Sequence, residues 1–334
     1  MKKLVAMLLV LSMVFMFVGC GSSAPANSPT GGASDSGKEP YLIGVSVPTV
    51  EMTFFAKMQT ELKAKYPNER VVVEFFNSAD NQEKQNKDVE DMIAKGMDGI
   101  VIIPITVEGA VPAIQYANEK NVPVITVDRQ ITEDADCEVL GFVGSDHKPM
   151  GVGCAELLVE GLEKMYPNEP EWIVVELTGT PGSSAAIDRG AGIHEVLDPI
   201  DKVTVKTFNG EFLTTTATNI AADVLISGVD GKPVHAFACH NDMMAEGVYQ
   251  ALVNAKMLDK VVVTGIDGQM STVQKVADGE IAGTVLQYPA MVTLGVELIC
   301  DHLDGKEVDK INFYETTKVS KDNAQSLIDD GSAY

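Results

Sequence analysis

Short apolar runs alternate with amphipathic stretches along the chain from residue 41 onward. The runs are rich in β-branched residues, whereas the stretches between them place apolar residues at helical spacing, as Phe55, Met58 and Leu62 do. This alternation predicts βαβ units, and therefore parallel sheets with helices on both faces. The predicted strands are residues 41–47, 70–76, 99–104, 124–127, 139–143, 172–177, 203–208, 234–238, 261–266, 282–286 and 311–317. The predicted helices are residues 54–65, 81–95, 107–120, 149–165, 184–197, 216–226, 242–254, 271–277, 290–303 and 321–329.

The alternation pauses at residues 144–146, where a Gly-Ser-Asp sequence precedes a long predicted helix, and then restarts. The chain length of 334 residues is that of about two domains. We therefore predict an α/β protein with two doubly wound parallel-sheet lobes of similar design. Within the first lobe, Asp80 is the predicted N-cap of the helix that ends at Lys95, with Glu83 as its capping-box partner.

The first residues have the features of a targeting segment. Lys2 and Lys3 precede an apolar run over residues 4–18 that is too short and wrongly flanked for a membrane span. The run ends in Phe-Val-Gly-Cys and resembles a bacterial lipoprotein signal, with Phe17 in place of the usual leucine. The resemblance implies that residues 1–19 are removed and that Cys20 becomes lipidated; an ordinary secretory signal with a chance cysteine is the alternative. Residues 20–40, rich in Gly, Ser, Pro and Ala, are predicted to form a flexible, lipid-anchored linker.

Composition narrows the range of partners. The formal net charge of −23 argues against nucleic acid and against anionic membrane surfaces, so the lipid is the only predicted membrane contact. The cysteines beyond Cys20 fit neither a zinc pattern nor a CxxC redox pair, and we predict structural roles for them. Whether any of them form disulfides stays an open question, because exported proteins can form them. The chain has no Asp-x-Asp-x-Asp-Gly calcium loop and no dinucleotide or P-loop fingerprint, so we expect neither a metal nor a cofactor.

Polar and aromatic side chains follow the ends of the predicted strands in both lobes. The most informative stretch is residues 123–130, in which a short apolar strand is followed by Asp128 and Arg129. In open α/β sheets ligands bind at this end of the strands, and a carboxylate and a guanidinium are costly to bury unless something uses them. A surface ion pair that closes a loop is the alternative. The other strand ends are followed by Phe54 and Phe55, Arg189, Asn241, Asp267 and Gln287.

This set of side chains suits a sugar. A sugar hydroxyl both donates and accepts, and the planar ends of Asp, Asn, Gln and Arg can serve two adjacent hydroxyls at once. Aromatic rings pack on the C–H faces of a pyranose or furanose and keep water away from those hydrogen bonds. A site of this kind discriminates strongly against analogues that leave a buried polar group unpaired. We therefore predict that both lobes present their strand ends to one cleft that holds a monosaccharide.

Together these stretches resemble the ribose-binding family of bacterial solute-binding proteins, the pentose and hexose receptors of ABC importers. The resemblance covers about residues 41–317, nearly the whole chain after the linker. The stretches that carry it are Phe54-Phe55, residues 123–130, residues 182–190, Asn241-Asp242-Met243, residues 265–268 and Gln287.

The resemblance implies a type I periplasmic binding protein fold, with a hinge of three strands that cross between the lobes near Ser145, Gln287 and Thr316. The N-terminal lobe would comprise residues 41–145 and 288–316, and the C-terminal lobe residues 146–287 and 317–334. An insertion at residues 133–137 and the tail beyond Val319 depart from the family and are expected to be peripheral.

The family also implies roles for the strand-end residues. Phe54 and Phe55 would stack on the ligand from the N-terminal lobe, and Phe212 would pack on it from the C-terminal lobe. The hydroxyls would be bound by Asp128, Arg129, Arg189, Asn241 and Asp267, with Gln287 at the hinge. Independently of the family, we predict that the carboxyl preceding each arginine, Asp128 or Asp188, fixes the guanidinium before the sugar arrives.

One departure from the family lies beside the paired aromatics, where this chain has Met52 and Thr53 and ribose binders carry an asparagine and then a proline. One polar contact is therefore lost or replaced, and the sugar need not be ribose. Four other residues carry simpler expectations. His147 and His302 are expected to be solvated, His240 to line the cleft, and Cys239 to be a buried strand-end residue.

The resulting hypothesis is a receptor rather than an enzyme. We predict a lipid-anchored monomer on the outer face of the bacterial cytoplasmic membrane. It would bind a ribose-like pentose or a hexose, close by hinge bending and deliver the sugar to the transmembrane subunits of an ABC permease. A sensory receptor for a sugar or a furanose-like signal molecule would use the same site and stays an alternative. A repressor would need an N-terminal DNA-binding domain, and an enzyme a nucleophile with a base or a cofactor loop; the sequence shows none of these.

Overall fold

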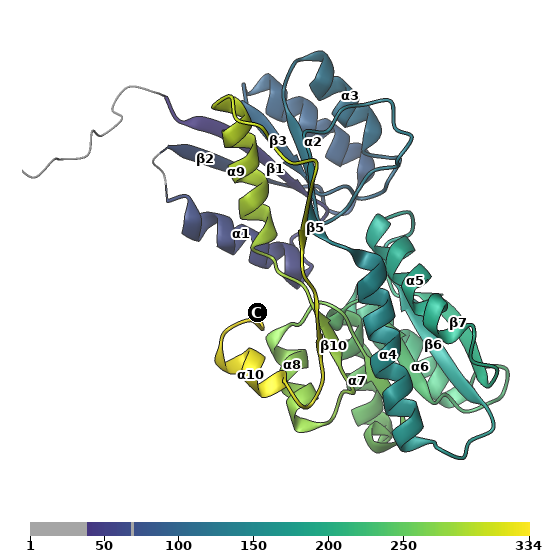
Figure 1. The fold of residues 1–334 in the computed structure, drawn as a ribbon. Coiled ribbons are helices and arrows are strands. Elements are labelled where there is room, and N and C mark those ends of the chain that lie inside the picture. The colour runs from purple at the N-terminus through teal and green to yellow at the C-terminus, as the bar shows by residue number, and fades with distance from the viewer. Residues whose placement is uncertain (1–38, 68–69) are drawn as a thin grey trace, which may run out of the picture. The chain divides into compact units, whose positions relative to one another are not determined.

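Figure 1 shows the chain in a computed structural model that describes residues 39–67 and 70–334. The predicted signal segment, the lipidation site Cys20 and residues 20–38 of the predicted linker lie outside the described residues. Glu39–Tyr334 form one unit with its own internal contacts. No helix in the described ranges is both long and apolar enough to cross a membrane.

The first sheet has six strands, all paired in parallel, in the order β11-β5-β4-β3-β1-β2. Its strands are β1 (Tyr41–Val47), β2 (Val71–Asn77), β3 (Gly99–Ile102), β4 (Val124–Val127), β5 (Phe142–Ser145) and β11 (Ile311–Tyr314). Alternate residues of the central strands face opposite helix layers, because successive side chains of a strand point to opposite faces. Val45 and Val101 pack with α1 (Thr53–Lys65) and α9 (Met291–Leu303). Ile100 and Ile102 pack with α2 (Gln82–Ala94) and α3 (Val111–Glu119).

The second sheet has four parallel strands in the order β7-β6-β8-β9. These are β6 (Trp172–Thr178), β7 (Val203–Asn209), β8 (Ala236–Cys239) and β9 (Val262–Thr264). On one face, Trp172 and Val174 pack with α4 (His147–Met165) and α5 (Ser184–Leu197). On the other face, Ile173 and Val175 pack with α6 (Thr214–Ser227) and α7 (Asp242–Ala255).

A smaller group of elements extends the second sheet. Single bridges from Thr264 to Gly283 and from Asp267 to Leu286 lead from β9 to β10 (Thr284–Leu286). β10 pairs antiparallel with β12 (Thr317–Val319). The remaining elements are the 3₁₀ helix Leu258–Lys260, α8 (Met270–Asp278) and α10 (Ala324–Asp329).

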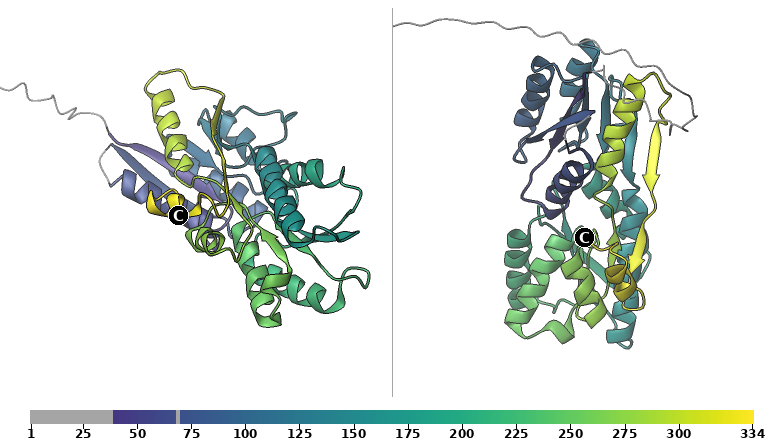
Figure 2. Two further views of the ribbon diagram at one scale, coloured as in Figure 1. Left: turned by 60° about the horizontal axis from the view of Figure 1, so that its bottom comes forward. Right: turned by 90° about the vertical axis from the view of Figure 1, so that its left-hand side faces the viewer.

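The chain passes three times between the two lobes (Figures 1 and 2). It crosses between β5 and α4, where Asp146 caps the helix, and between β10 and α9, through Gln287. The third crossing lies between β11 and β12, through Glu315 and Thr316. The predicted α/β fold with two doubly wound parallel-sheet lobes is therefore confirmed.

Two local predictions were wrong. The N-cap of α2 is Asn81, whose side chain accepts a hydrogen bond from the Lys84 amide over 2.8 Å. Asp80 instead has a φ of 55°, the left-handed conformation of a turn, whereas an N-cap needs an extended backbone. The predicted strand 311–317 is two strands in different sheets, β11 beside β5 and β12 beside β10. A continuous β-like pattern does not reveal where a chain changes from one sheet to another.

All four cysteines in the described part of the chain are free thiols. Cys239 is fully buried at the end of β8, as predicted. Cys154 is fully buried on α4, and burial raises the pKa of its thiol to about 12, so the thiol stays protonated. The open question of disulfides is therefore settled for these residues: none is paired.

The corrected cap of α2 can be tested by a matched pair of variants. We expect Asn81→Ala to lower the free energy of unfolding by about 1 kcal/mol, because the Lys84 amide loses its side-chain acceptor. Asp80→Gly should stay within about 0.5 kcal/mol of wild type, because glycine adopts this φ without strain and Asp80 makes no cap. Urea unfolding followed by circular dichroism measures both. A larger loss for Asp80→Gly than for Asn81→Ala would contradict the assigned cap.

Candidate functional site

All nine predicted site residues line one cavity between the lobes, with about 330 Å³ of space not filled by atoms. They are Phe54, Phe55, Asp128, Arg129, Arg189, Phe212, Asn241, Asp267 and Gln287. Three residues that were not predicted as site residues also line it: Met52, Ala185 and Met243. All three fall within or beside the stretches that carried the sequence resemblance. The resemblance had already marked Met52 as a departure from the family at a polar contact. Ala185 and Met243 send no such signal, and only the packing shows that they reach the cavity.

Corresponding carboxyls from the two lobes lie at the ends of equivalent strands. Asp128 follows β4, and its amide donates to Val143 O over 2.8 Å. Asp267 follows β9, and its amide donates to Val285 O over 2.8 Å. Both have a positive φ, 62° for Asp128 and 136° for Asp267, and Phe212 has a φ of 59°. Such a conformation costs a non-glycine residue on the order of 1–3 kcal/mol, so the surrounding contacts must hold these three residues in place.

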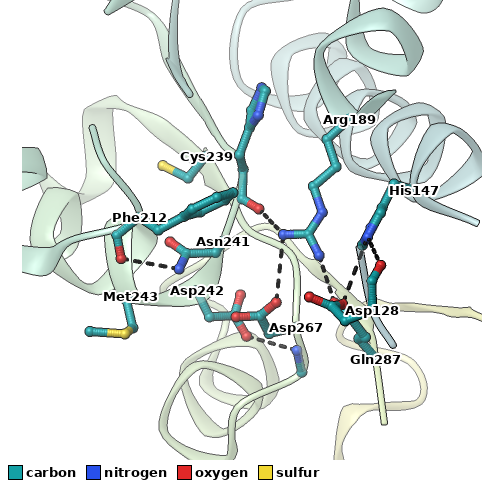
Figure 3. A network of polar contacts seen from close by, with 12 residues as sticks. Asp128, His147, Arg189, Phe212, Cys239, Asn241, Asp242, Met243, Asp267 and Gln287 are labelled. Carbon is teal, nitrogen blue, oxygen red and sulfur yellow. Dashed lines mark hydrogen bonds and ion pairs between the residues drawn. The ribbon is translucent and has the colours of Figure 1, made fainter. Parts of the chain in front are cut away.

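A chain of buried hydrogen bonds joins the two lobes across the cavity (Figure 3). Arg189 on α5 donates from Nη1 to His240 O over 2.5 Å and from Nη2 to Gln287 Oε1 over 2.6 Å. Gln287, at the second crossing, donates from Nε2 to Oδ1 of Asp128 in the N-terminal lobe. Asp267 Oδ1 lies 3.7 Å from Arg189 Nη1. All of these side chains are buried.

The prediction that Asp188 fixes Arg189 is wrong. The bonds of Arg189 run to the network just described, and Asp188 lies half-buried on another side of α5, where burial and nearby carboxyls raise its pKa. Adjacent residues of a helix do not face the same direction, so the preceding carboxyl cannot serve the guanidinium. Asp128, which lies in a turn rather than a helix, does face Arg129: its Oδ2 lies 3.9 Å from Arg129 Nε.

The guanidinium of Arg129 lies between two aromatic rings from different lobes. Its central carbon is 5.4 Å from the ring centre of Phe55 and 5.5 Å from that of Phe212. Its Nη1 donates to the carbonyls of Pro104 and Ile105 over 3.4 and 3.3 Å. Burial lowers the pKa of Arg129, and the carboxyls around it oppose that shift. The rings stabilise the desolvated cation through its contact with their faces.

Some polar groups of the site are already used, and others are available to a ligand. The Nε atoms of Arg129 and Arg189 are buried and have no hydrogen-bond partner among the described residues. Asn241, by contrast, accepts from the Met244 amide over 2.9 Å and donates to Phe212 O over 3.2 Å. It therefore ties the Phe212 loop to the start of α7 and keeps one amide hydrogen and one lone pair for a ligand.

Charges in the cavity are balanced. Burial raises the pKa of Asp128 and raises that of Asp267 well above its usual range, and nearby guanidiniums oppose both shifts. Two carboxyls and two guanidiniums therefore face one space, which suits a neutral polar ligand better than an ion. Within residues 39–67 and 70–334, no group of three or more His, Cys, Asp or Glu side chains is placed to hold a metal ion.

Two histidine predictions were wrong. His147 is buried because α4 begins there rather than at residue 149, and its Nε2 lies 2.7 Å from Asp128 O. Burial holds its pKa well below the usual value. The side chain of His240 does not line the cavity; it is buried against Glu176, with Nε2 2.9 Å from Oε1, and only its carbonyl belongs to the network. His302 is exposed, as predicted.

Asp242 supports the loop that carries Asp267. Its Oδ2 accepts from the amides of Gly268 and Gln269 over 2.9 and 2.8 Å, and its Oδ1 accepts from Thr284 Oγ1 over 2.7 Å. Burial raises the pKa of Asp242 to about 7. Its carboxyl therefore holds Asp267 in place through the backbone, without lining the cavity itself.

Comparison with known proteins identifies the family. The sequence profile of the family described as periplasmic binding protein domain matches residues 43–307 of this chain. The chain belongs to the periplasmic binding protein family. The ribose import binding protein RbsB of Bacillus subtilis (strain 168) is 32% identical over 313 residues, which cover 93% of this chain and 96% of the relative. The fructose import binding protein FruE of Bifidobacterium longum (strain NCC 2705) is 26% identical over 332 residues, or 98% of this chain and 97% of the relative.

A solved structure of this family agrees with the fold. The periplasmic binding protein component of the arabinose ABC transporter from Shewanella sp. ANA-3, bound to α- and β-L-arabinofuranose, has a TM-score of 0.78 and 26% identity. The match covers 86% of the present chain and 95% of the chain in the solved structure. The resemblance to a ribose-binding-protein-like sugar-binding family, predicted from the sequence, is therefore confirmed.

Gly179 leaves room for the ring of Phe212, and this packing can be tested. A Cβ at residue 179 would lie 1.9 Å from the ring, so Gly179→Ala must displace it. We expect this variant to lose about 1–3 kcal/mol of unfolding free energy, and its crystal structure to show Phe212 moved away from Arg129. Gly190→Ala on α5, where the nearest atom would lie at 3.4 Å, should be as stable as wild type or more so. An unmoved Phe212 ring in the Gly179→Ala crystal would contradict this packing.

The buried carboxyl of Asp242 predicts a pH dependence of stability. An aspartate in an unfolded chain has a pKa of about 3.9, whereas burial raises that of Asp242 to about 7. The folded state holds this proton more tightly, so the residue lowers the free energy of unfolding as the pH rises from about 4 to about 7.

Asp242→Asn removes this titration and keeps the shape of the side chain. Its amide oxygen can accept from Gly268 and Gln269, and its amide nitrogen can donate to Thr284. We expect urea unfolding at several pH values to show a smaller decline in this variant between about pH 4 and about pH 7. An equal decline in both proteins would exclude Asp242 as its source.

Proposed function

We propose that this protein is the substrate-binding component of an ABC sugar importer and binds one monosaccharide in the cavity between its lobes. Phe54, Phe55 and Phe212 would pack on the C–H faces of the sugar. Its hydroxyls would be bound by Asp128, Arg129, Arg189, Asn241, Asp267 and Gln287. The observation that carries the proposal is a buried, charge-balanced set of polar groups from both lobes around a cavity lined by aromatic rings.

The polarity of the cavity supports a small, neutral, hydroxyl-rich ligand. Its lining combines two carboxyls and two guanidiniums with three aromatic rings, and a few polar groups on otherwise apolar walls are typical of small-molecule sites. The carboxyls can accept from sugar hydroxyls, and the Nε atoms of Arg129 and Arg189 can donate to them. Relatives named for the import of ribose and fructose support the same class of ligand.

Met52 narrows the choice of sugar. It is the N-cap of α1, is 4% exposed and lines the cavity. Met243 of the other lobe lines the same cavity, and its Sδ lies 3.4 Å from the Thr53 amide. A thioether is only a weak acceptor and cannot donate, so it cannot serve a hydroxyl as an amide does. We therefore favour a ribose-like pentose or a hexose that presents C–H or methyl groups, rather than a hydroxyl, toward the two methionines.

Ligand binding would be coupled to closure of the lobes. Arg129 of the N-terminal lobe lies 5.5 Å from the ring centre of Phe212 in the C-terminal lobe, so the lobes must separate to admit a sugar. A ligand that contacts both lobes shifts the population toward the closed arrangement. The moving bodies would be residues 41–145 with 288–316 and residues 146–287 with 317–334, joined by the three crossings.

The family places the protein outside the cytoplasm, and we propose how it is held there. Residues 1–19 would be a lipoprotein signal, Cys20 would carry the lipid, and residues 20–40 would tether the monomer to the outer face of the cytoplasmic membrane. From there it would deliver the sugar to the transmembrane subunits of the permease. The positive start, the apolar run and the cysteine that ends it support the anchor.

A thermal-shift screen against pentoses, hexoses, deoxy sugars and polyols tests the binding function. A ligand that binds only the folded state raises the Tm in proportion to RT ln(1 + [L]/Kd). We expect at least one sugar to raise the Tm of the wild type, and Arg189→Ala to abolish the shift. Arg189→Ala removes one partner of a buried charged network, and such a loss typically costs about 2–5 kcal/mol of binding free energy.

Two further variants make this test specific. Arg189→Lys keeps the charge but lacks the planar end whose two nitrogens bond to His240 O and Gln287, so it should also bind weakly and fold more stably than Arg189→Ala. Arg70→Ala removes a surface arginine, 62% exposed and paired with Asp304, and should keep the full shift. Wild-type affinity in Arg189→Ala would exclude the assigned site, and a wild type that no sugar stabilises would exclude the proposed function.

A further inference from the structure

The tail beyond Val319, expected to be peripheral, returns to Phe54, a residue of the cavity wall. Ala333 is buried with residues of α8, β12 and α10. The Tyr334 amide donates to Gly268 O over 3.4 Å, and Tyr334 O accepts from the amide of Met270, the first residue of α8, over 2.7 Å. Tyr334 is therefore fixed on the loop that follows Asp267. In Figure 1 the chain end marked C lies between α1 of the N-terminal lobe and α10 of this tail.

The side chain of Tyr334 reaches the other lobe. Its ring centre lies 6.1 Å from that of Phe54 on α1, with the planes inclined by 60°. Phe54 in turn packs edge-on against Phe55, with 5.6 Å between the ring centres. Both phenylalanines line the cavity. Tyr334 does not itself line the cavity in this arrangement, but its ring packs against the cavity wall at Phe54 from the opposite lobe.

The hydroxyl of Tyr334 is buried and has no hydrogen-bond partner among the described residues. A buried hydroxyl without a partner is costly, and a phenylalanine would fill the same space without that cost. Burial raises the pKa of Tyr334 well above its usual value, and the nearby carboxyls of Asp267 and Asp242 raise it further. The hydroxyl therefore stays protonated and can donate a hydrogen bond beside the Asp267 carboxyl.

We infer that Tyr334 is a ligand-binding residue, whose ring packs against the cavity wall at Phe54 and whose hydroxyl donates to a sugar hydroxyl beside Asp267. This inference rests on the proposed function and adds a contact to the same site. The bond would provide the partner that the phenol otherwise lacks. Because Tyr334 is anchored in one lobe and contacts Phe54 in the other, it would also favour the closed, liganded arrangement.

Tyr334→Phe separates the hydroxyl from the ring. The variant keeps the backbone bonds to Gly268 and Met270 and the packing on Phe54. By isothermal titration calorimetry with the sugar found in the screen, we expect its Kd to rise about 3- to 10-fold, as for the loss of one neutral hydrogen bond. Tyr249→Phe is the matched control, because the Tyr249 hydroxyl bonds to Glu280 at an exposed position over 2.8 Å, outside the cavity. The Kd of Tyr249→Phe for the sugar should equal that of the wild type.

Monodeoxy analogues of the same sugar identify the contact. The analogue that lacks the hydroxyl bound by Tyr334 should lose affinity for the wild type and lose less for Tyr334→Phe, whereas the other analogues should lose equally with both proteins. Equal Kd values of Tyr334→Phe and wild type for the parent sugar, or no such coupling for any analogue, would overturn the inference and leave the proposed function standing. A wild type that binds no sugar would overturn both.

Discussion

The hydrogen bonds that run from Arg189 through Gln287 to Asp128 hold the two lobes together through groups that have almost no contact with water. Removing a charged side chain from water costs several kcal/mol, and the cost is recovered only when its partners are placed well. The second crossing of the chain supplies the uncharged link between a guanidinium of one lobe and a carboxyl of the other. One glutamine at the hinge therefore couples the buried charged groups of the two lobes.

Topology explains why these groups meet. Each lobe is a parallel sheet whose strands end at one edge, so residues that follow those strands gather there although they are far apart in sequence. Asp128 and Asp267 occupy the same position in their lobes and both adopt a positive φ. Their neighbours hold them in this strained conformation: His147 bonds to the carbonyl of Asp128, and Asp242 binds the two amides that follow Asp267.

A site built in this way is organised before its ligand arrives. Within its own lobe, the guanidinium of Arg129 is held by two carbonyls and packs on the ring of Phe55. The guanidinium of Arg189 is held by Gln287 and by a backbone carbonyl. A ligand therefore loses little affinity to the ordering of these side chains. The same rigidity demands a ligand with matching donors and acceptors, because a buried group left without a partner is penalised.

Residue patterns were sufficient for the fold class and for eight of the nine polar and aromatic residues at the cavity, because strand ends and helical spacing are local features and strand ends share one edge of a sheet. The ninth, Phe212, was predicted only through the resemblance to the ribose-binding family. Tertiary structure decided what depends on contacts between distant segments. It placed Met52, Ala185 and Met243 in the cavity wall. It paired Arg189 with Gln287 rather than with Asp188, and it buried His147 beside Asp128. It also divided the last strand between two sheets and brought Tyr334 back to Phe54. No local pattern encodes these contacts, because each forms only when the two lobes and the tail pack against one another.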